Sequence, residues 1–170
     1  MIIDRAAYDA MIQHMREVAP REGVGLLAGP RDRPDPPGGQ WQAPAGAIVD
    51  RWVPLRNASD FPGLRYEIDP QEQIAAYEAL DADGRWPWVQ AHSHVPPCAA
   101  PSSLDVRYAV DQSLLHMVVS LAGTSPVAVL WHLNPDVAPV EQAKRVRYQV
   151  VDLGFHTVGN SDLTRGVSSA

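Results

Sequence analysis

The chain has 170 residues, of which 45% are hydrophobic, and a formal net charge of −6. This length predicts one domain that buries about two thirds of its unfolded surface, and the acidic balance argues against nucleic acid as the partner, because phosphate binding needs a dense face of lysine and arginine. The single cysteine, Cys98, excludes an intramolecular disulfide and a cysteine-rich zinc ribbon, and it is typical of a cytoplasmic protein.

Two features of the sequence argue against export and membrane insertion. Asp4 and Arg5 interrupt the apolar N-terminus before the core of a signal peptide can form. The longest apolar region, 117–131, is broken at 123–126 by glycine, polar residues and proline. We therefore expect a cytoplasmic protein with no membrane partner.

The first half of the chain predicts a helix and three strands around a long loop. Apolar residues recur at helical spacing over 4–19. The apolar run 22–29 is bounded by proline and glycine, which predicts a buried strand. Residues 29–46 are so rich in proline and glycine that they predict a loop, whose role the sequence leaves open. Residues 48–54 and 64–68 predict two further strands.

The second half predicts helices alternating with strands. Asp69 and Pro70 open a helix that Gly84 ends, because aspartate caps a helix and proline fits its first position. The further expected elements are a strand at 85–94, a helix at 102–113 opened by Ser102, strands at 114–123 and 125–133, and a strand at 146–151.

This order of elements mixes adjacent strands with helical crossovers. It predicts an α/β fold in which a mixed β-sheet carries helices on its faces. We expect the catalytic domain to span residues 1–153. Residues 154–170 are polar and weakly patterned, which predicts a loose C-terminal tail.

The stretch AHSHVPPCAAPSSLD, residues 91–105, carries the candidate chemistry. Side chains two apart on a strand share a face, so His92 and His94 can direct both imidazoles to one point. Hydrolytic zinc takes three protein ligands and keeps one position for water, and Asp105 is the candidate third ligand. Glu22 is the candidate general base for that water. Ser102 is the candidate donor to the oxygen of a tetrahedral intermediate.

A simpler interpretation exists for part of this pattern. Ser102 and Asp105 also fit an ordinary helix capping box, and the two interpretations are compatible because a cap can hold the helix that carries a ligand. Cys98 is interpreted as an incidental loop thiol, since a fourth protein ligand would exclude the catalytic water. His116 and His132 lie in apolar strand patterns and are interpreted as core or edge residues.

The pattern His-x-His, seven residues and Ser-x-x-Asp, with EGVGLLAG upstream, resembles the JAMM (MPN-plus) zinc metalloprotease family in its compact prokaryotic form. RWVPLRN and YEIDPQE extend the resemblance over most of residues 1–133. It implies an MPN fold with cytidine-deaminase-like architecture. It also implies these roles: zinc bound by His92, His94 and Asp105, the catalytic water deprotonated by Glu22, and the oxyanion stabilised by Ser102.

The chain departs from the family pattern at two positions that are neither ligand nor base. Val95 follows the second histidine where members usually have proline. Val24 precedes Gly25 where members often have cysteine. The departures affect the expected shape of the loops rather than the expected chemistry.

The resemblance implies a zinc-dependent isopeptidase or peptidase that cleaves after the C-terminal Gly-Gly tail of ubiquitin-like or sulfur-carrier β-grasp proteins. Two alternatives stay open: a non-catalytic scaffold that binds a ubiquitin-like partner, and a hydrolase that releases an amino acid from a sulfur-carrier protein. The chain keeps all five positions of the site, which favours an enzyme. Apolar loop residues permit a homodimer without requiring one.

Overall fold

The computed structural model describes residues 1–31, 46–95, 98–109, 111 and 113–153. The predicted tail at 154–170 and most of the predicted loop at 29–46 lie outside the described residues. No described helix is both long and apolar enough to cross a membrane.

Two β-sheets form the centre of the fold. The larger has six strands in the order β4-β2-β5-β6-β7-β8. Strands β5 and β6 pair in parallel, whereas their neighbours pair antiparallel, so the predicted mixed sheet is confirmed. Its members are β2 (Val24–Pro30), β4 (Arg51–Leu55), β5 (Arg85–His94), β6 (Leu115–Ser120), β7 (Val127–Leu133) and β8 (Ala143–Val146).

The smaller sheet has three strands in the order β3-β1-β9. Both strand pairs in it are parallel, and β1, at the start of the chain, lies between β3 and β9. Its members are β1 (Ile2–Asp4), β3 (Ile48–Val49) and β9 (Gln149–Val151).

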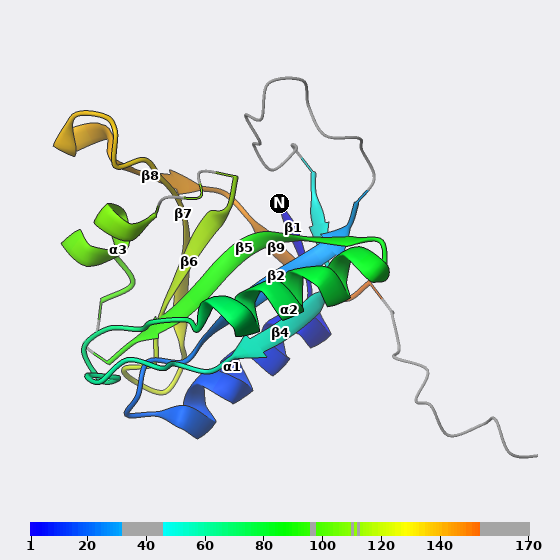
Figure 1. Ribbon diagram of the computed structural model, residues 1–170, viewed down its shortest axis with the longest axis horizontal. Coiled ribbons are helices and arrows are strands. Elements are labelled where there is room, and N and C mark those ends of the chain that lie inside the picture. The colour runs from blue at the N-terminus through cyan, green and yellow to red at the C-terminus, as the bar shows by residue number, and fades with distance from the viewer. Residues whose placement is uncertain (32–45, 96–97, 110, 112, 154–170) are drawn as a thin grey trace, which may run out of the picture.

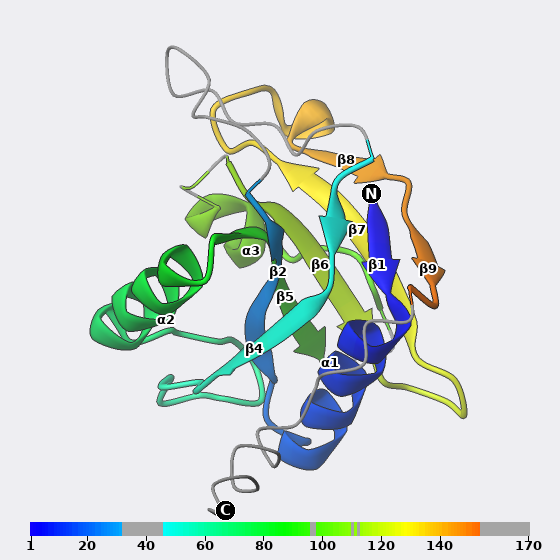
Figure 2. The same cartoon turned by 90° about the vertical axis from the view of Figure 1, so that its right-hand side faces the viewer.

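Helices cover both faces of the larger sheet, and Figure 2 shows α1 and α2 on opposite sides of it. Helix α1 (Arg5–Val18) buries its apolar stripe against Leu27, Val89 and Met117. Helix α2 (Pro70–Ala82) buries Leu80 on the other face, against Val24 and Leu26. Alternate residues of β2 therefore serve two cores, which explains why this strand is a continuous apolar run.

Helix α3 (Ser103–Tyr108) and a short 3-10 helix, η1 (Pro139–Glu141), complete the fold. Helix α3 lies on the α2 face, where Val106 and Ala109 join the cluster around Val118 and Trp131. Figure 1 shows α2 and α3 as separate segments along this face, with β5 and β6 between them. This face carries His92 and His94.

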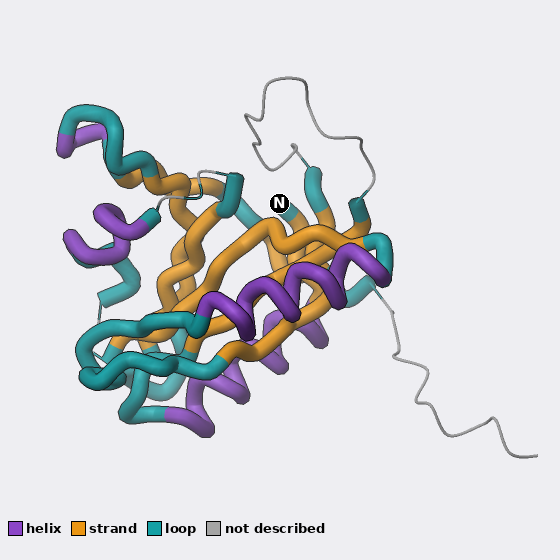
Figure 3. The backbone as a smooth tube through the Cα atoms, in the orientation of Figure 1, coloured by secondary structure: helices purple, strands orange, loops and turns teal. Residues whose placement is uncertain are grey.

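The structure corrects four predicted elements. Residues 64–68 form no strand, and Figure 3 shows the segment between β4 and α2 as a loop. It contains one isolated bridge, Asn57 to Ile68. The predicted helix 102–113 ends at Tyr108. The strands predicted at 48–54 and 146–151 are each divided between the two sheets, as β3 and β4 and as β8 and β9.

The two divided strands share a cause, because the pieces β3 and β9 both pair with β1, a strand that the sequence did not predict. Strand β1 has three residues, too few to show the alternation by which a strand is recognised. The alternation of Leu64, Tyr66 and Ile68 looks like a strand, but Leu64 is 80% exposed. Its neighbours are held by side-chain hydrogen bonds rather than by a ladder, as described below.

Candidate metal centre

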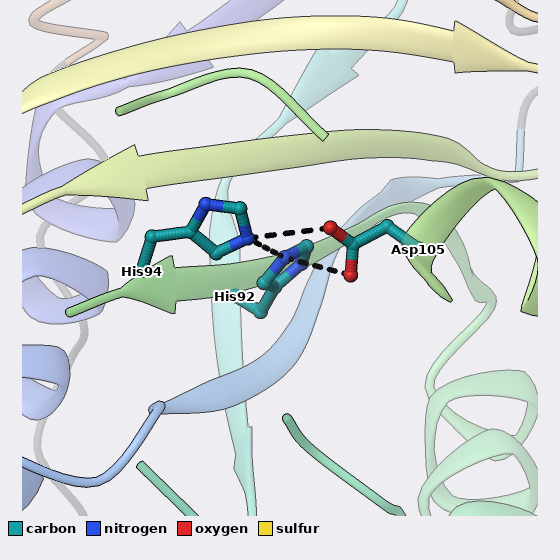
Figure 4. Close-up of side chains that lie close together, drawn as sticks. All are labelled: His92, His94 and Asp105. Carbon is teal, nitrogen blue, oxygen red and sulfur yellow. Dashed lines mark hydrogen bonds and ion pairs between the residues drawn. The ribbon is translucent and has the colours of Figure 1, made fainter. Parts of the chain in front are cut away.

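Three predicted side chains converge at the end of β5 (Figure 4). His92 and His94 project from the same face of this strand, with their Nε2 atoms 3.1 Å apart. Asp105, from α3, places Oδ1 3.3 Å from Nε2 of His92 and Oδ2 3.3 Å from Nε2 of His94. All three residues are buried, so the cluster is recessed from the surface.

The cluster fits a metal ion in spacing and in chemistry. Ligand atoms around tetrahedral zinc, at bond lengths of about 2.0–2.1 Å, lie about 3.3–3.4 Å from one another, close to the separations observed. Imidazole nitrogen and carboxylate oxygen are ordinary zinc donors. Nδ1–H of His94 donates to the carbonyl of Cys98 at 3.1 Å, which leaves its Nε2 lone pair free for a metal. The residues present therefore suit a divalent metal ion.

A capping box positions the carboxylate of Asp105. The Ser102 hydroxyl accepts a hydrogen bond from the backbone N–H of Asp105, and Asp105 Oδ2 accepts one from the backbone N–H of Ser102 at 2.6 Å. The predicted cap is therefore confirmed. A hydroxyl that accepts still has its own proton to donate, and Ser102 lines the same cleft as Asp105.

The electrostatics favour an ionised Asp105. Burial raises the pKa of its carboxyl, but hydrogen bonds from His92 and His94 outweigh burial and hold that pKa well below its usual range. Burial alone would lower the pKa of His94, and its hydrogen bond to Asp105 reverses the direction, so the pKa of His94 is raised. Zinc binding would displace the Nε2 protons that make these hydrogen bonds, because a histidine ligand must be neutral.

Glu22 lies just before β2 and lines the same cleft as His94 and Asp105. Its backbone N–H donates to the carbonyl of Pro62 at 2.6 Å. Burial raises the pKa of its carboxyl above the ordinary 4.5, although the nearby histidines oppose this shift. A raised pKa suits a residue that must accept a proton near neutral pH and later release it.

Ser93, between the two histidines, has a separate structural role. Its side chain points away from the cluster, and its hydroxyl accepts a hydrogen bond from the backbone N–H of Gly23 at 2.9 Å. The backbone N–H of Ser93 donates to the carbonyl of Gly23 at the same distance. The strand that carries His92 and His94 is thus bonded to the residue that follows Glu22.

Asn57 is a positioning residue that the sequence analysis did not assign to the site. Its amide group takes part in five hydrogen bonds among the described residues. The partners are the carbonyls of Glu22, Pro62 and Arg65 and the backbone N–H groups of Ser59 and Glu67. One side chain therefore joins the backbone of Glu22 to the loop that forms a wall of the cleft.

Replacing Asn57 by alanine is expected to destabilise the protein by about 2–4 kcal/mol, because several buried or half-buried backbone groups lose their partner. Asn57→Asp keeps the acceptor oxygen but not the N–H donors, so it should rescue only the part of the stability that Ser59 and Glu67 contribute. Urea unfolding of the three proteins measures both effects. An equal free energy of unfolding for the wild type and Asn57→Ala would show that the hydrogen bonds of Asn57 do not stabilise the fold.

The cluster opens into a cleft of about 690 Å³. One wall is the loop 63–68 with Gln73 of α2, and the other is α3 with Ala100 and Pro101 before it. Gln90 and His116, from neighbouring strands, line the cleft between these walls. A recess of this size is typical of sites that bind small ligands or chain segments.

The polar groups of the cleft floor were not predicted from the sequence. Tyr66 packs its ring against His92, with centroids 4.6 Å apart, and its hydroxyl accepts a hydrogen bond from Gln90 Nε2 at 2.8 Å. The two-residue alternation from His94 through His92 continues to Gln90, and this pattern could have revealed Gln90. Tyr66 begins the YEIDPQE segment of the family resemblance, but no spacing in the sequence indicates that it reaches the site from the loop.

Comparisons with known proteins agree with this architecture. The family model described as prokaryotic homologues of the JAB domain matches residues 4–134. The CysO-cysteine peptidase of Mycobacterium tuberculosis is 31% identical over 122 residues, which are 71% of this chain and 73% of that protein. The desampylase of Haloferax volcanii is 28% identical over 121 residues, 69% of this chain and 78% of that protein.

Solved structures show the same fold. Protein DSY2949 from Desulfitobacterium hafniense superposes with a TM-score of 0.71 at 28% identity, covering 89% of this chain and 94% of that one. A JAB1/MPN domain protein from Archaeoglobus fulgidus gives a TM-score of 0.52 at 18% identity, covering 89% of this chain and all of that one, and this likeness concerns the fold alone. The family model over residues 4–134 and the relative that is 31% identical show that the chain belongs to the prokaryotic branch of the JAB, or JAMM, domain family.

Proposed function

We propose that the protein is a zinc-dependent isopeptidase or peptidase that cleaves after the C-terminal Gly-Gly tail of ubiquitin-like or sulfur-carrier β-grasp proteins. The observation that carries this proposal is the convergence of His92, His94 and Asp105 beside a cleft that Glu22 also lines. Relatives named as a CysO-cysteine peptidase, a probable TtuB-protein conjugate cleaving protease and a desampylase support the substrate class.

In the proposed mechanism His92, His94 and Asp105 hold zinc. Bound zinc supplies a Lewis acid that polarises a carbonyl group and lowers the pKa of water to about 7. Glu22 accepts the proton of the attacking water and delivers it to the leaving amine. Ser102 donates its hydroxyl proton as a hydrogen bond to the developing oxyanion. The capping box holds Ser102 and Asp105 in fixed relation throughout.

The depth of the cluster supports a narrow substrate tail. His92 is 0% exposed and His94 and Asp105 are each 9% exposed, so the reacting carbonyl must enter a recess to meet them. A segment of two glycines carries no side chains and can approach a recessed site closely. Tails with bulky residues at these positions are expected to be poor substrates.

Exposed apolar side chains on both walls of the cleft support a folded protein as the partner. Leu64 is 80% exposed on the loop, and Tyr108 is 68% exposed on α3, with Leu104 beside it at 40%. All three line the cleft. Apolar groups gathered around a polar site are typical of protein interaction surfaces. We propose that they contact the folded body of the β-grasp substrate.

Replacing Leu64 by serine is expected to raise KM about tenfold for a protein substrate and to leave KM unchanged for a short tail peptide, since a peptide lacks the folded body. Ile74→Ser is the matched control, because Ile74 is 58% exposed on α2 and does not line the cleft. Steady-state kinetics on both substrates measure the difference. An equal rise in KM for protein and peptide would contradict this assignment of the surface.

The alternative activity, release of an amino acid from a sulfur-carrier protein, uses the same residues and differs in the leaving group. The similarity to the CysO-cysteine peptidase favours it as a second candidate. A non-catalytic scaffold is disfavoured because all five positions of the proposed site are present.

The catalytic domain is proposed to span residues 1–153, since its last strand, β9, ends at Val151 and pairs with β1. The single cysteine favours the cytoplasm as its compartment.

A panel of substrates tests the proposal. β-grasp proteins are prepared with one amino acid, a longer peptide or an isopeptide-linked lysine after the Gly-Gly tail, and each is incubated with the zinc-loaded protein. Intact-mass spectrometry then identifies the bond that is cleaved. Cleavage after the second glycine supports the proposal, and the preferred leaving group separates the two activities. No cleavage of any of these substrates would reject both.

A further inference from the structure

His116 is a buried polar residue that the proposed mechanism does not use. It lies on β6, is 3% exposed and lines the cleft. Neither of its ring nitrogens has a hydrogen-bond partner among the described residues. A buried donor or acceptor without a partner destabilises a fold. A polar ring kept at such a position therefore indicates a ligand that completes its hydrogen bonds.

The sheet register places His116 beside the proposed metal ligands. His116 of β6 pairs with Gln90 of β5, and Val118 pairs with His92. Because the two strands are parallel, His116 lies two residues before the position on β6 that pairs with His92. Two residues of a strand span about 6–7 Å. An extended substrate chain advances by the same amount in about two residues. His116 is thus at the right distance to contact a residue near the scissile bond.

The charged groups around His116 favour an uncharged ligand. Burial lowers the pKa of His116 to about 4, so near pH 7 its neutral ring offers one N–H donor and one acceptor nitrogen. The acidic side chains that line the cleft are Glu22, Glu67, Asp105 and Asp111, and the described lining has Arg65 as its basic residue. Arg65 is paired with Glu67. A carboxylate would meet repulsion here, whereas a peptide group, which has its own N–H and C=O, matches the ring.

We propose that His116 binds the substrate by hydrogen-bonding to a backbone peptide group about two residues from the scissile bond. Gln90, whose amide is oriented by its hydrogen bond to Tyr66, lies beside it on the cleft floor. This proposal rests on the proposed function, because it assigns a subsite to the same cleft. It makes His116 a determinant of KM rather than a ligand of the metal or a participant in proton transfer.

Kinetics of His116→Phe test the proposal. Phenylalanine keeps a planar ring and removes both hydrogen-bonding atoms, so KM for a tail peptide extended beyond Gly-Gly is expected to rise about tenfold, with bound zinc and kcat nearly unchanged. The melting temperature should stay equal or rise, because an unsatisfied buried group is removed. His116→Gln retains a donor and an acceptor and should recover part of the loss in KM. His132→Phe, on β7 and outside the cleft lining, is the matched control.

A fall of several degrees in the melting temperature of both His116 variants, with KM unchanged, would assign the residue a structural role and overturn the proposal. Histidine-selective ¹⁵N NMR provides a readout that does not need hydrolysis. The extended Gly-Gly peptide is added to the wild type, and the His116 signals are assigned by their loss in His116→Phe. We expect these ring signals to shift on binding, even in a protein that fails to cleave the peptide. Unshifted His116 signals under saturating peptide would overturn the proposal independently of the proposed activity.

Discussion

Replacing Glu22 by glutamine is expected to lower kcat by about 10²- to 10⁴-fold and to leave bound zinc in place. Glutamine has nearly the same shape but cannot accept the proton of the attacking water. Glu22 lies outside the group of three side chains whose donor atoms converge, so metal content should not depend on it. Elemental analysis and turnover of the same preparation measure the two quantities together. A variant with normal kcat would remove Glu22 from the mechanism.

The pH dependence provides a second test of Glu22. Burial raises the pKa of its carboxyl above 4.5, and the general base acts in its ionised form, so kcat/KM should decrease as pH falls through this raised pKa. The folded protein holds this proton more tightly than the unfolded chain does. The stability contributed by the protonated group is therefore lost as pH rises through the folded-state pKa. Glu22→Gln should accordingly raise the melting temperature of the metal-free protein at neutral pH.

Replacing Asp105 by asparagine is expected to abolish both zinc binding and turnover. Asparagine removes the negative charge of the carboxylate whose oxygens face Nε2 of both histidines, so the proposed metal loses its anionic ligand. Loss of a residue that only orients a ligand already lowers metal affinity by about 10- to 100-fold, and loss of the ligand itself should exceed this. Turnover should then fall at least as far as in Glu22→Gln, because the Lewis acid and the water that it activates are lost together.

Asp111→Asn is the matched control for the loss of charge. Asp111 also lines the cleft, but its carboxylate accepts hydrogen bonds from Ser113 and belongs to no described cluster of metal donors. This variant should keep its zinc and most of its kcat. Full zinc occupancy in Asp105→Asn, measured by elemental analysis after dialysis, would contradict the proposed ligand set.

Much of the candidate site could be predicted from the sequence because its parts follow local rules. The two-residue period of a strand placed His92 and His94 on one face, and a capping pattern placed Asp105 in the first turn of a helix. The structure brings both histidines and the aspartate together as expected. Glu22 is different, since no local pattern links it to residues so far along the chain. It was a candidate because it stands at the start of a separate buried strand, and the resemblance to a family then implied its role.

Residues that act across the fold escaped the sequence analysis. Asn57 looks like an ordinary residue after a strand, and its importance comes from five backbone groups, one of Glu22 and four of the loop after β4, that converge on its amide. His116 was interpreted as a core or edge residue, and burial is confirmed. Its position on the cleft floor depends on the register between β5 and β6. Strand register is set by the whole sheet, so one strand read alone cannot reveal it.

The most direct test of the central claim compares one substrate under three conditions. A β-grasp protein extended beyond its Gly-Gly tail is incubated with the zinc-loaded protein, with the chelated protein and with the chelated protein after zinc is restored. Cys98→Ser is assayed in parallel because Cys98 lines the cleft. We predict cleavage after the second glycine in the first and third conditions, in both proteins, and none in the second. Cleavage that survives complete removal of zinc, or that requires Cys98, would contradict the account.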